Sequence, residues 1–217
     1  MNASKRVRVL WSKIRGRLLW ALEPLGFSRS ARPRTFEIAY VILVSSEVHN
    51  YMTRLQLDIL RRYGANPGLT ASPHITLKLG FEVSEIEPFA AYLDRIAGDI
   101  EPFEICVRNI DVFDGGIIFL DVEQDPRLEN LRRRILRDLS EKYGVEPYPL
   151  EGDQYRFHAT LAYGLSNRDF ERAWKELKDL KVEFRFVFDT LGLFCHTGDG
   201  WITYRRAVLS LRASRLS

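Results

Sequence analysis

The chain of 217 residues has only two cysteines, Cys106 and Cys195, and no long uncharged apolar run. Two cysteines allow at most one bridge, which excludes a disulfide-stapled scaffold, and their apolar surroundings predict buried free thiols in a reducing compartment. The apolar runs at 18–22 and 40–44 are far too short to cross a bilayer. A Glu-Pro pair at 23–24 interrupts the one candidate for a signal-peptide core. We therefore expect a cytoplasmic protein.

Histidine is also scarce, with four in the whole chain. No histidine or cysteine has the spacing of a tetrahedral metal site, so we expect neither a metal ion nor a cofactor. His196 falls in the hairpin loop 195–200 and His49 near the start of a helix, where solvated positions are the simplest interpretation. His74 and His158 are left as candidates for chemistry.

Acidic residues are almost absent from the first 35 residues, which hold nine basic residues and one glutamate. This segment therefore carries +8, and because the whole chain carries +3, the remainder carries −5. Apolar residues recur in the segment at helical spacing, which predicts a basic amphipathic helix and a linker over 1–35. Such a helix could dock on the body, bind a membrane surface or nucleic acid, or serve as a transit peptide.

From residue 36 to 211 the pattern predicts one bilobal domain, which we expect to be monomeric. Two similar units of strand, helix, strand, helix, strand span 36–113 and 117–194, and a last strand covers 201–211. A Tyr-Gly pair at 63–64 recurs at 143–144 where a helix ends in each unit. The other expected elements are strands 36–45, 74–81, 103–113, 117–123, 157–163 and 183–194, and helices 47–64, 84–99, 126–143 and 167–180. Two such units predict a pseudo-symmetric pair of lobes with a cleft between them.

The same motif, His-x-Thr-Leu, occurs in the equivalent strand of each unit. It reads His74-Ile75-Thr76-Leu77 in the first and His158-Ala159-Thr160-Leu161 in the second, and a glycine follows three residues later in both. Alternate residues of a strand share a face, so each histidine projects with its threonine while the apolar residues between them face the core. Pseudo-symmetry would bring the two His/Thr pairs together in the cleft.

Paired imidazoles and hydroxyls suit phosphate-ester chemistry. With an ordinary pKa near 6.5, one histidine can be neutral and accept a proton while the other is protonated and donates one. The threonine hydroxyls can donate to the phosphate oxygens, where charge develops in the transition state. We therefore assign His74 and His158 as the catalytic pair and Thr76 and Thr160 as phosphate donors. A packing motif preserved by duplication is the alternative.

These motifs resemble the two-histidine (2H) phosphoesterase superfamily, in particular its 2′-5′ RNA ligase-like branch. The resemblance implies an α+β fold of two lobes, each with an antiparallel sheet facing a central cleft and helices outside. It also implies metal-independent hydrolysis of 2′,3′-cyclic phosphates on RNA ends or nucleotides to 2′-phosphates, with reversible 2′-5′ joining in some members. Ligase-like members often place an arginine shortly after the second motif, where this chain has Ala162-Tyr163-Gly164. Alternatives are a 3′-end-trimming RNA phosphodiesterase, a non-catalytic module that binds nucleotides or RNA ends, and a passive scaffold for the basic helix.

Other cleft residues are predicted only from strand parity. Lys78 and Arg156 share the parity of the histidines and are candidate phosphate ligands. Tyr40 and Phe119 are candidates for stacking on a base, with burial in the core as the alternative. The run Arg132-Arg133-Arg134 lies in a predicted helix and is typical of a solvated face, with an RNA-facing ridge as the alternative.

Overall fold

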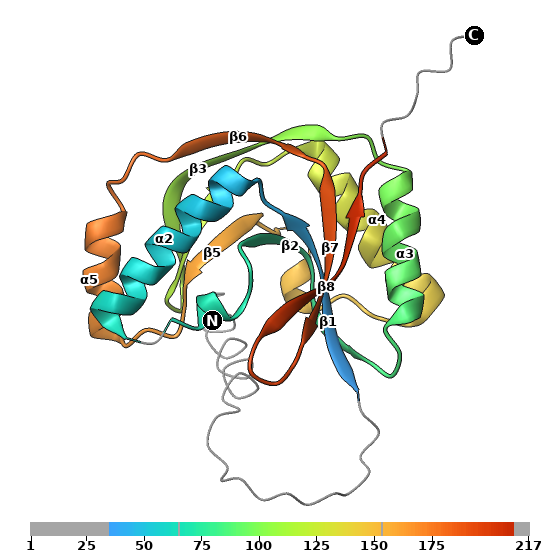
Figure 1. Cartoon of the computed structure of the whole chain (residues 1–217), viewed down its shortest axis with the longest axis horizontal. Coiled ribbons are helices and arrows are strands. Elements are labelled where there is room, and N and C mark those ends of the chain that lie inside the picture. The colour runs from blue at the N-terminus through green and yellow to red at the C-terminus, as the bar shows by residue number, and fades with distance from the viewer. Residues whose placement is uncertain (1–34, 65, 153, 211–217) are drawn as a thin grey trace, which may run out of the picture.

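The computed structural model describes residues 35–64, 66–152 and 154–210 (Figure 1). The expected basic helix over 1–35 lies outside these residues except for its last position. The helices are α2 (Ser46–Tyr63), α3 (Glu87–Gly98), α4 (Pro126–Tyr143) and α5 (Asn167–Leu177), with short 3-10 turns η1 (Pro67–Thr70) and η2 (Pro149–Glu151). The strands are β1 (Phe36–Leu43), β2 (His74–Val83), β3 (Phe103–Phe113), β4 (Ile117–Val122), β5 (His158–Ala162), β6 (Glu183–Phe188), β7 (Thr190–His196) and β8 (Trp201–Val208). No helix in the described part of the chain is both long and apolar enough to span a membrane.

Corresponding helices of the two expected units start and stop in similar ways. The N-terminus of α2 is capped by Ser45, which accepts from the Val48 N–H, and that of α4 by Asp125. Both caps satisfy N–H groups that the first helical turn leaves unpaired. Both helices end in Tyr-Gly, and the two glycines, Gly64 and Gly144, have φ of 86° and 66°. Because residues other than glycine rarely adopt a positive φ, glycine is favoured at the C-terminal end of both helices.

The described strands form two antiparallel sheets of four, ordered β2-β1-β7-β8 (sheet A) and β5-β4-β3-β6 (sheet B). The predicted single strand 183–194 was wrong: it is two strands, β6 and β7, separated at Asp189 and placed in different sheets. Strand β3, the third of the first expected unit, pairs with β4 and β6 in sheet B, while β7 pairs with β1 and β8 in sheet A. Each sheet therefore contains strands from both expected units.

The apolar faces of both sheets pack into one large cluster of buried residues. Helix α3 contacts β7 and β8, and Figure 1 shows α3 and α5 at opposite ends of the molecule. Both cysteines are buried and free, as expected.

The two histidine-bearing strands, β2 and β5, are edge strands of different sheets that contact each other at the centre of the molecule (Figure 1). Helix α2 packs on β5, and α4 packs on β2. An edge strand leaves backbone groups unpaired, and here side chains from the opposite unit satisfy them. Asn66 donates to Leu161 O at 3.0 Å, and the Tyr155 hydroxyl donates to Thr76 O at 2.8 Å. These reciprocal bonds hold the two strands at a fixed separation.

Candidate active site

The two His/Thr pairs occupy equivalent positions in the structure. Each histidine is the first residue of its edge strand, and each pair is partly exposed on one face. The intervening residues of the opposite face, Ile75, Leu77, Ala159 and Leu161, are all fully buried. The alternation expected from strand periodicity therefore holds over both motifs.

Both imidazoles are oriented by the same backbone hydrogen bond. His74 Nδ1 lies 2.7 Å from the Ser72 carbonyl oxygen, and His158 Nδ1 lies 2.8 Å from the Arg156 carbonyl oxygen. A carbonyl oxygen only accepts, so Nδ1 must carry the proton in each ring. In the neutral form this leaves the lone pair on Nε2, the nitrogen that can exchange a proton with a bound molecule.

Burial favours the neutral form of both histidines. Burial lowers the pKa of His74 to about 4, the Ser72 hydrogen bond opposes this shift, and the nearby His158 adds to it. The pKa of His158 is lowered mainly by burial, and the hydrogen bond to the Arg156 carbonyl opposes this shift. The charge of the Arg156 guanidinium lowers the pKa further, while Asp121 raises it. The effect of His158 on the pKa of His74 also indicates that the two rings are close enough to interact electrostatically.

Aromatic rings pack against both imidazoles. Phe194 contacts His74 edge-on, with ring centroids 4.9 Å apart. Phe113 contacts His158 in the same way at 4.9 Å, and Phe119 lies 5.3 Å from it. These contacts restrict the rotamers of the two histidines, which keeps each Nε2 in a defined position.

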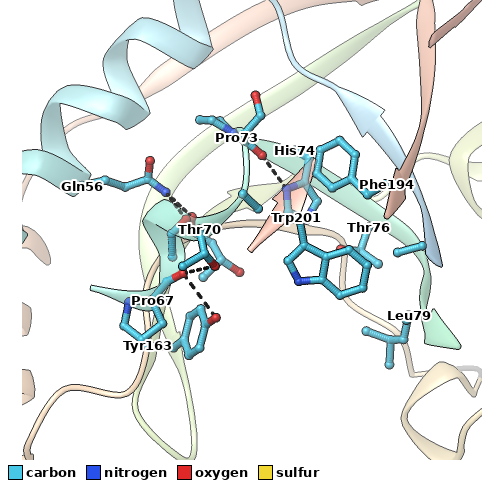
Figure 2. Close-up of a pocket in the computed structure, with 16 residues that line it drawn as sticks. Gln56, Pro67, Thr70, Pro73, His74, Thr76, Leu79, Tyr163, Phe194 and Trp201 are labelled. Carbon is cyan, nitrogen blue, oxygen red and sulfur yellow. Dashed lines mark hydrogen bonds between the residues drawn. The ribbon is translucent and has the colours of Figure 1, made fainter. Parts of the chain in front are cut away.

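A pocket opens over the first His/Thr pair on sheet A and reaches the second unit (Figure 2). Its lining contains no lysine, arginine, aspartate or glutamate. Thr160 of β5 lines it, whereas His158 is not among the lining residues. The lining residues are Ala39, Gln56, Pro67, Gly68, Thr70, Ala71, Ser72, Pro73, His74, Thr76, Leu79, Gly80, Thr160, Tyr163, Phe194 and Trp201.

Of the lining residues, only His74, Thr76 and Thr160 were predicted from the sequence, and the others include Gln56, Tyr163 and Trp201. Figure 2 shows the Trp201 and Phe194 rings beside His74, with Tyr163 across the pocket near Pro67. Gln56 Nε2 donates to Thr160 O at 3.2 Å, and the Tyr163 hydroxyl donates to Pro67 O at 3.3 Å. Tyr163 is the residue directly after β5, so a phenol lines the pocket near the position where ligase-like members often carry an arginine.

Glycines allow the close approach of Trp201 and its loop. A Cβ at Gly80 would lie 2.9 Å from the Trp201 ring, and a Cβ at Gly200 would lie 2.8 Å from Thr70 O. Contacts this short would force the backbone or the ring to move. The β7–β8 loop can therefore pack against η1 and form one wall of the pocket only with glycine at position 200.

The structure contradicts the placement of Lys78 in the cleft. The pairing of β1 with β2 shifts register on both sides of Tyr40, which lies opposite Lys78, and such an irregularity reverses the faces of the residues beyond it. Lys78 is fully buried, and its Nζ lies 2.8 Å from Glu151 Oε2, which is also buried. Leu79 and Gly80 line the pocket in its place.

The two candidate stacking residues have no surface to offer a base. Tyr40 is fully buried on the core face, where its hydroxyl donates to Phe89 O at 2.9 Å. The prediction from strand parity was wrong for β1, because Ala39 lines the pocket and Tyr40 does not. Phe194 of the neighbouring strand β7 also lines it. Phe119 does lie on the face of His158, opposite Thr160, but it is fully buried beneath Phe113 and Arg156.

Arg156 lies on the His158 side, but its charge is already matched. It forms ion pairs with Asp111 at 2.7 Å and Asp121 at 2.8 Å, and these carboxylates raise the pKa of the guanidinium. The three side chains together carry −1, so this cluster does not supply a free cation for a phosphate.

The run Arg132-Arg133-Arg134 is not a uniformly solvated face. Arg132 is buried, donates to the carbonyls of Glu151 and Gly152, and stacks over Tyr155 with 4.0 Å between guanidinium and ring centroid. Its two neighbours are on the surface, where they pair with Glu129 and Asp99. Arg132 thus supports the segment that carries Glu151 and Tyr155, the two residues bonded to β2.

Two antiparallel sheets with a histidine-bearing edge strand in each define the class of the protein, the two-histidine phosphoesterase fold. The family model of the 2′-5′ RNA ligase superfamily matches residues 44–200, and the chain belongs to this superfamily. No curated protein matches the sequence.

Solved structures share this fold at low sequence identity. Escherichia coli LigT in complex with 3′-AMP is 16% identical, with a TM-score of 0.59 over 82% of this chain and 99% of that chain. TT0787 of Thermus thermophilus is 15% identical, with a TM-score of 0.59 over 80% and 97%. A structure described as a phosphoesterase is 14% identical, with a TM-score of 0.53 over 81% and 99%. LigT has also been crystallised with ATP. These similarities confirm the fold expected from the sequence.

Proposed function

We propose that the protein hydrolyses 2′,3′-cyclic phosphates on RNA ends or nucleotides to 2′-phosphates, without a metal ion. The observation that carries the proposal is the matched pair of histidines, each held by a carbonyl at Nδ1, with no hydrogen-bond partner for Nε2 among the described residues. Membership of the 2′-5′ RNA ligase superfamily and the 3′-AMP bound to LigT support the same substrate class.

In the proposed reaction a water oxygen bonds to phosphorus and the bond from phosphorus to O3′ breaks. The neutral imidazole accepts a proton from the attacking water, and the protonated imidazole donates its proton to the departing O3′. Thr76 and Thr160 donate hydrogen bonds to the non-bridging oxygens as negative charge grows on them. One proton is taken up and one is released, so the pair returns to a singly protonated state with the two roles exchanged.

Phosphorus NMR tests this function directly. We expect the protein to convert nucleoside 2′,3′-cyclic phosphates to 2′-phosphates in excess EDTA, because two histidines supply both proton transfers. Loss of activity in EDTA with recovery on adding a divalent ion would contradict the metal-free mechanism. Release of a cyclic phosphate from an RNA 3′ end would instead identify a trimming phosphodiesterase. Ligand-induced shifts of protein resonances without any product would identify a binding module.

The lowered histidine pKa values predict an acidic optimum. The reactive form of the free protein has one neutral and one protonated imidazole. Its population is highest at a pH between the two histidine pKa values. Burial brings both values below the ordinary 6.5, with His74 at about 4, so kcat/KM should follow a bell whose maximum lies below pH 6.5. The measurement is kcat/KM from pH 4 to 9 at constant ionic strength.

Circular dichroism at each pH is the control for that profile. A buried neutral histidine destabilises the fold when it must be protonated, so stability should fall as the pH drops from 6.5 toward 4. A maximum above pH 7, or a rate that changes in one direction only while the fold is intact, would refute the acid/base pair.

A further inference from the structure

A row of directly opposed residues crosses sheet A, starting at Thr76. Thr76 on β2 lies opposite Val41 on β1, and Val41 lies opposite Gly192 on β7. Gly192 in turn lies opposite Arg206 on β8. Opposed residues project from the same face of a sheet, so Arg206 belongs to the face that carries the pocket. With about 4.8 Å between neighbouring strands, the row from Thr76 to Arg206 is about 14 Å long.

Arg206 is exposed and has no hydrogen-bond or ion-pair partner in the described part of the chain. Its neighbour Arg205 projects from the other face and holds Asp94 of α3 with two bonds of 3.1 and 2.7 Å. The structure therefore presents two adjacent arginines in opposite situations. Arg205 is part of the packing between β8 and α3, whereas Arg206 is a cation on the cleft side that no described residue pairs.

No charged residue stands in the row between Thr76 and Arg206. Val41 is fully buried and packs with Ala39 and Phe194, two residues of the pocket lining. A Cβ at position 192 would lie 2.9 Å from Val41 Cγ2, so glycine at this position allows the Val41 side chain to pack against the backbone of β7. No carboxylate stands in this row to repel a polyanion that lies along it.

The equivalent row on sheet B has the opposite character. Thr160 lies opposite Phe119, and Phe119 lies opposite Asp111. Asp111 and Asp121 flank Arg156 and leave a net negative charge on this side. A polyanion extending from the site is therefore repelled by sheet B and attracted toward the free guanidinium of sheet A.

We propose that Arg206 binds a phosphodiester upstream of the reacting nucleotide, which makes the preferred substrate the end of an RNA strand and not a free nucleotide. The strand would run from the pocket over β1 and β7 to β8. This inference rests on the proposed function and names the substrate class of the same site. The pocket itself has no cationic side chain apart from what His74 can carry, so the charge of an upstream phosphate must be met elsewhere, and a guanidinium suits it.

The test compares two substrates and two variants. The substrates are a nucleoside 2′,3′-cyclic phosphate and a trinucleotide that ends in the same group. We expect Arg206→Ala to lower kcat/KM on the trinucleotide about 10-fold, because one charge-assisted hydrogen bond is lost. The value of kcat/KM on the nucleoside 2′,3′-cyclic phosphate should stay the same. The slope of log kcat/KM against log salt should also become shallower by about 0.7 for the trinucleotide. The matched control, Arg205→Ala, should leave kcat/KM unchanged on both substrates.

Neutral methylphosphonate linkages in the trinucleotide provide a second readout. With these linkages the wild-type protein should behave like Arg206→Ala, and the variant should show no further loss. An equal loss on both substrates, or no loss on either, would overturn the strand path.

If neither substrate is hydrolysed, the proposed function fails while the strand path can still be judged. Fluorescence anisotropy with a labelled trinucleotide that ends in a 2′-phosphate would then decide it. Weaker binding by Arg206→Ala than by Arg205→Ala supports the path, and equal binding by the two variants overturns it.

Discussion

Replacing either His74 or His158 by alanine is expected to lower kcat on a 2′,3′-cyclic phosphate by about 10²–10⁴-fold, the range for loss of a general acid or base. Each ring has its Nδ1 proton engaged by a carbonyl, which leaves Nε2 for proton transfer, and the pocket lining contains no further histidine that could replace either ring. The assay is phosphorus NMR or chromatographic quantification of the 2′-phosphate. Both variants should keep the wild-type circular dichroism spectrum, because each histidine is the first residue of its strand and its side chain hydrogen-bonds, among the described residues, only to a nearby backbone carbonyl.

Controls can separate this effect from a general loss of packing. His49→Ala makes the same substitution in the first turn of α2, outside the pocket lining, and should leave the rate unchanged. Thr76→Val and Thr160→Val should lose less than the histidine variants, about 10²–10³-fold, as for one donor to a developing negative charge. The double histidine variant should be little slower than either single variant, because residues that act as a unit are not additive. A single histidine variant with a normal rate would refute the assignment.

Replacing Glu151 by glutamine is expected to destabilise the protein by about 3–5 kcal/mol, the usual cost of breaking a buried ion pair by removing one partner. Glu151 is buried with Lys78, accepts from the backbone N–H groups of Leu79 and Tyr148, and lies near Arg132. Its loss would leave the buried Lys78 ammonium without its ion-pair partner and would remove one of the negative charges that favour the buried Arg132 guanidinium. Urea unfolding monitored by fluorescence measures the change in the free energy of unfolding.

The matched variant for this prediction is Lys78→Met combined with Glu151→Gln. Removing both charges avoids the unpaired cation at position 78, so the double variant should recover much of the stability lost by Glu151→Gln alone. Lys78→Met alone should cost less than Glu151→Gln, because the carboxylate keeps its two backbone N–H donors and the nearby Arg132. If the single and double variants are equally unstable, the charge of Lys78 is not the cause.

The placement of the two His/Thr pairs in the candidate site could be predicted because a strand alternates its faces with a period of two. That rule places His74 with Thr76 and His158 with Thr160, and both pairs lie where it requires. The same rule failed two residues later at Lys78, because the register shifts beside Tyr40 depend on how β1 and β2 pair. Pairing is a property of two distant segments, so counting along one strand cannot reveal it.

The remaining errors also come from long-range contacts. Arg132 resembles its neighbours in sequence, but its burial depends on carbonyl groups at positions 151 and 152 on another segment. Trp201 joins the pocket because the β7–β8 loop folds back on η1, more than 120 residues earlier in the chain. The division of 183–194 between two sheets also depends on distant segments. Strand propensity is continuous over this range, but β6 pairs with β3 and β7 pairs with β1 and β8.

The exchange of β3 and β7 between the sheets has a consequence for how the molecule acquires its structure. One inner strand of sheet B, β3, comes from the first half of the chain. One inner strand of sheet A, β7, comes from the second half. Most of the pairing is therefore between segments far apart in sequence, a topology typical of slow folding because long loops must close before contacts form. A chain cut at the turn after β3 would yield two fragments, neither able to complete a sheet by itself. The two halves share the His-x-Thr-Leu motif, yet the strand exchange requires them to fold as a single cooperative unit.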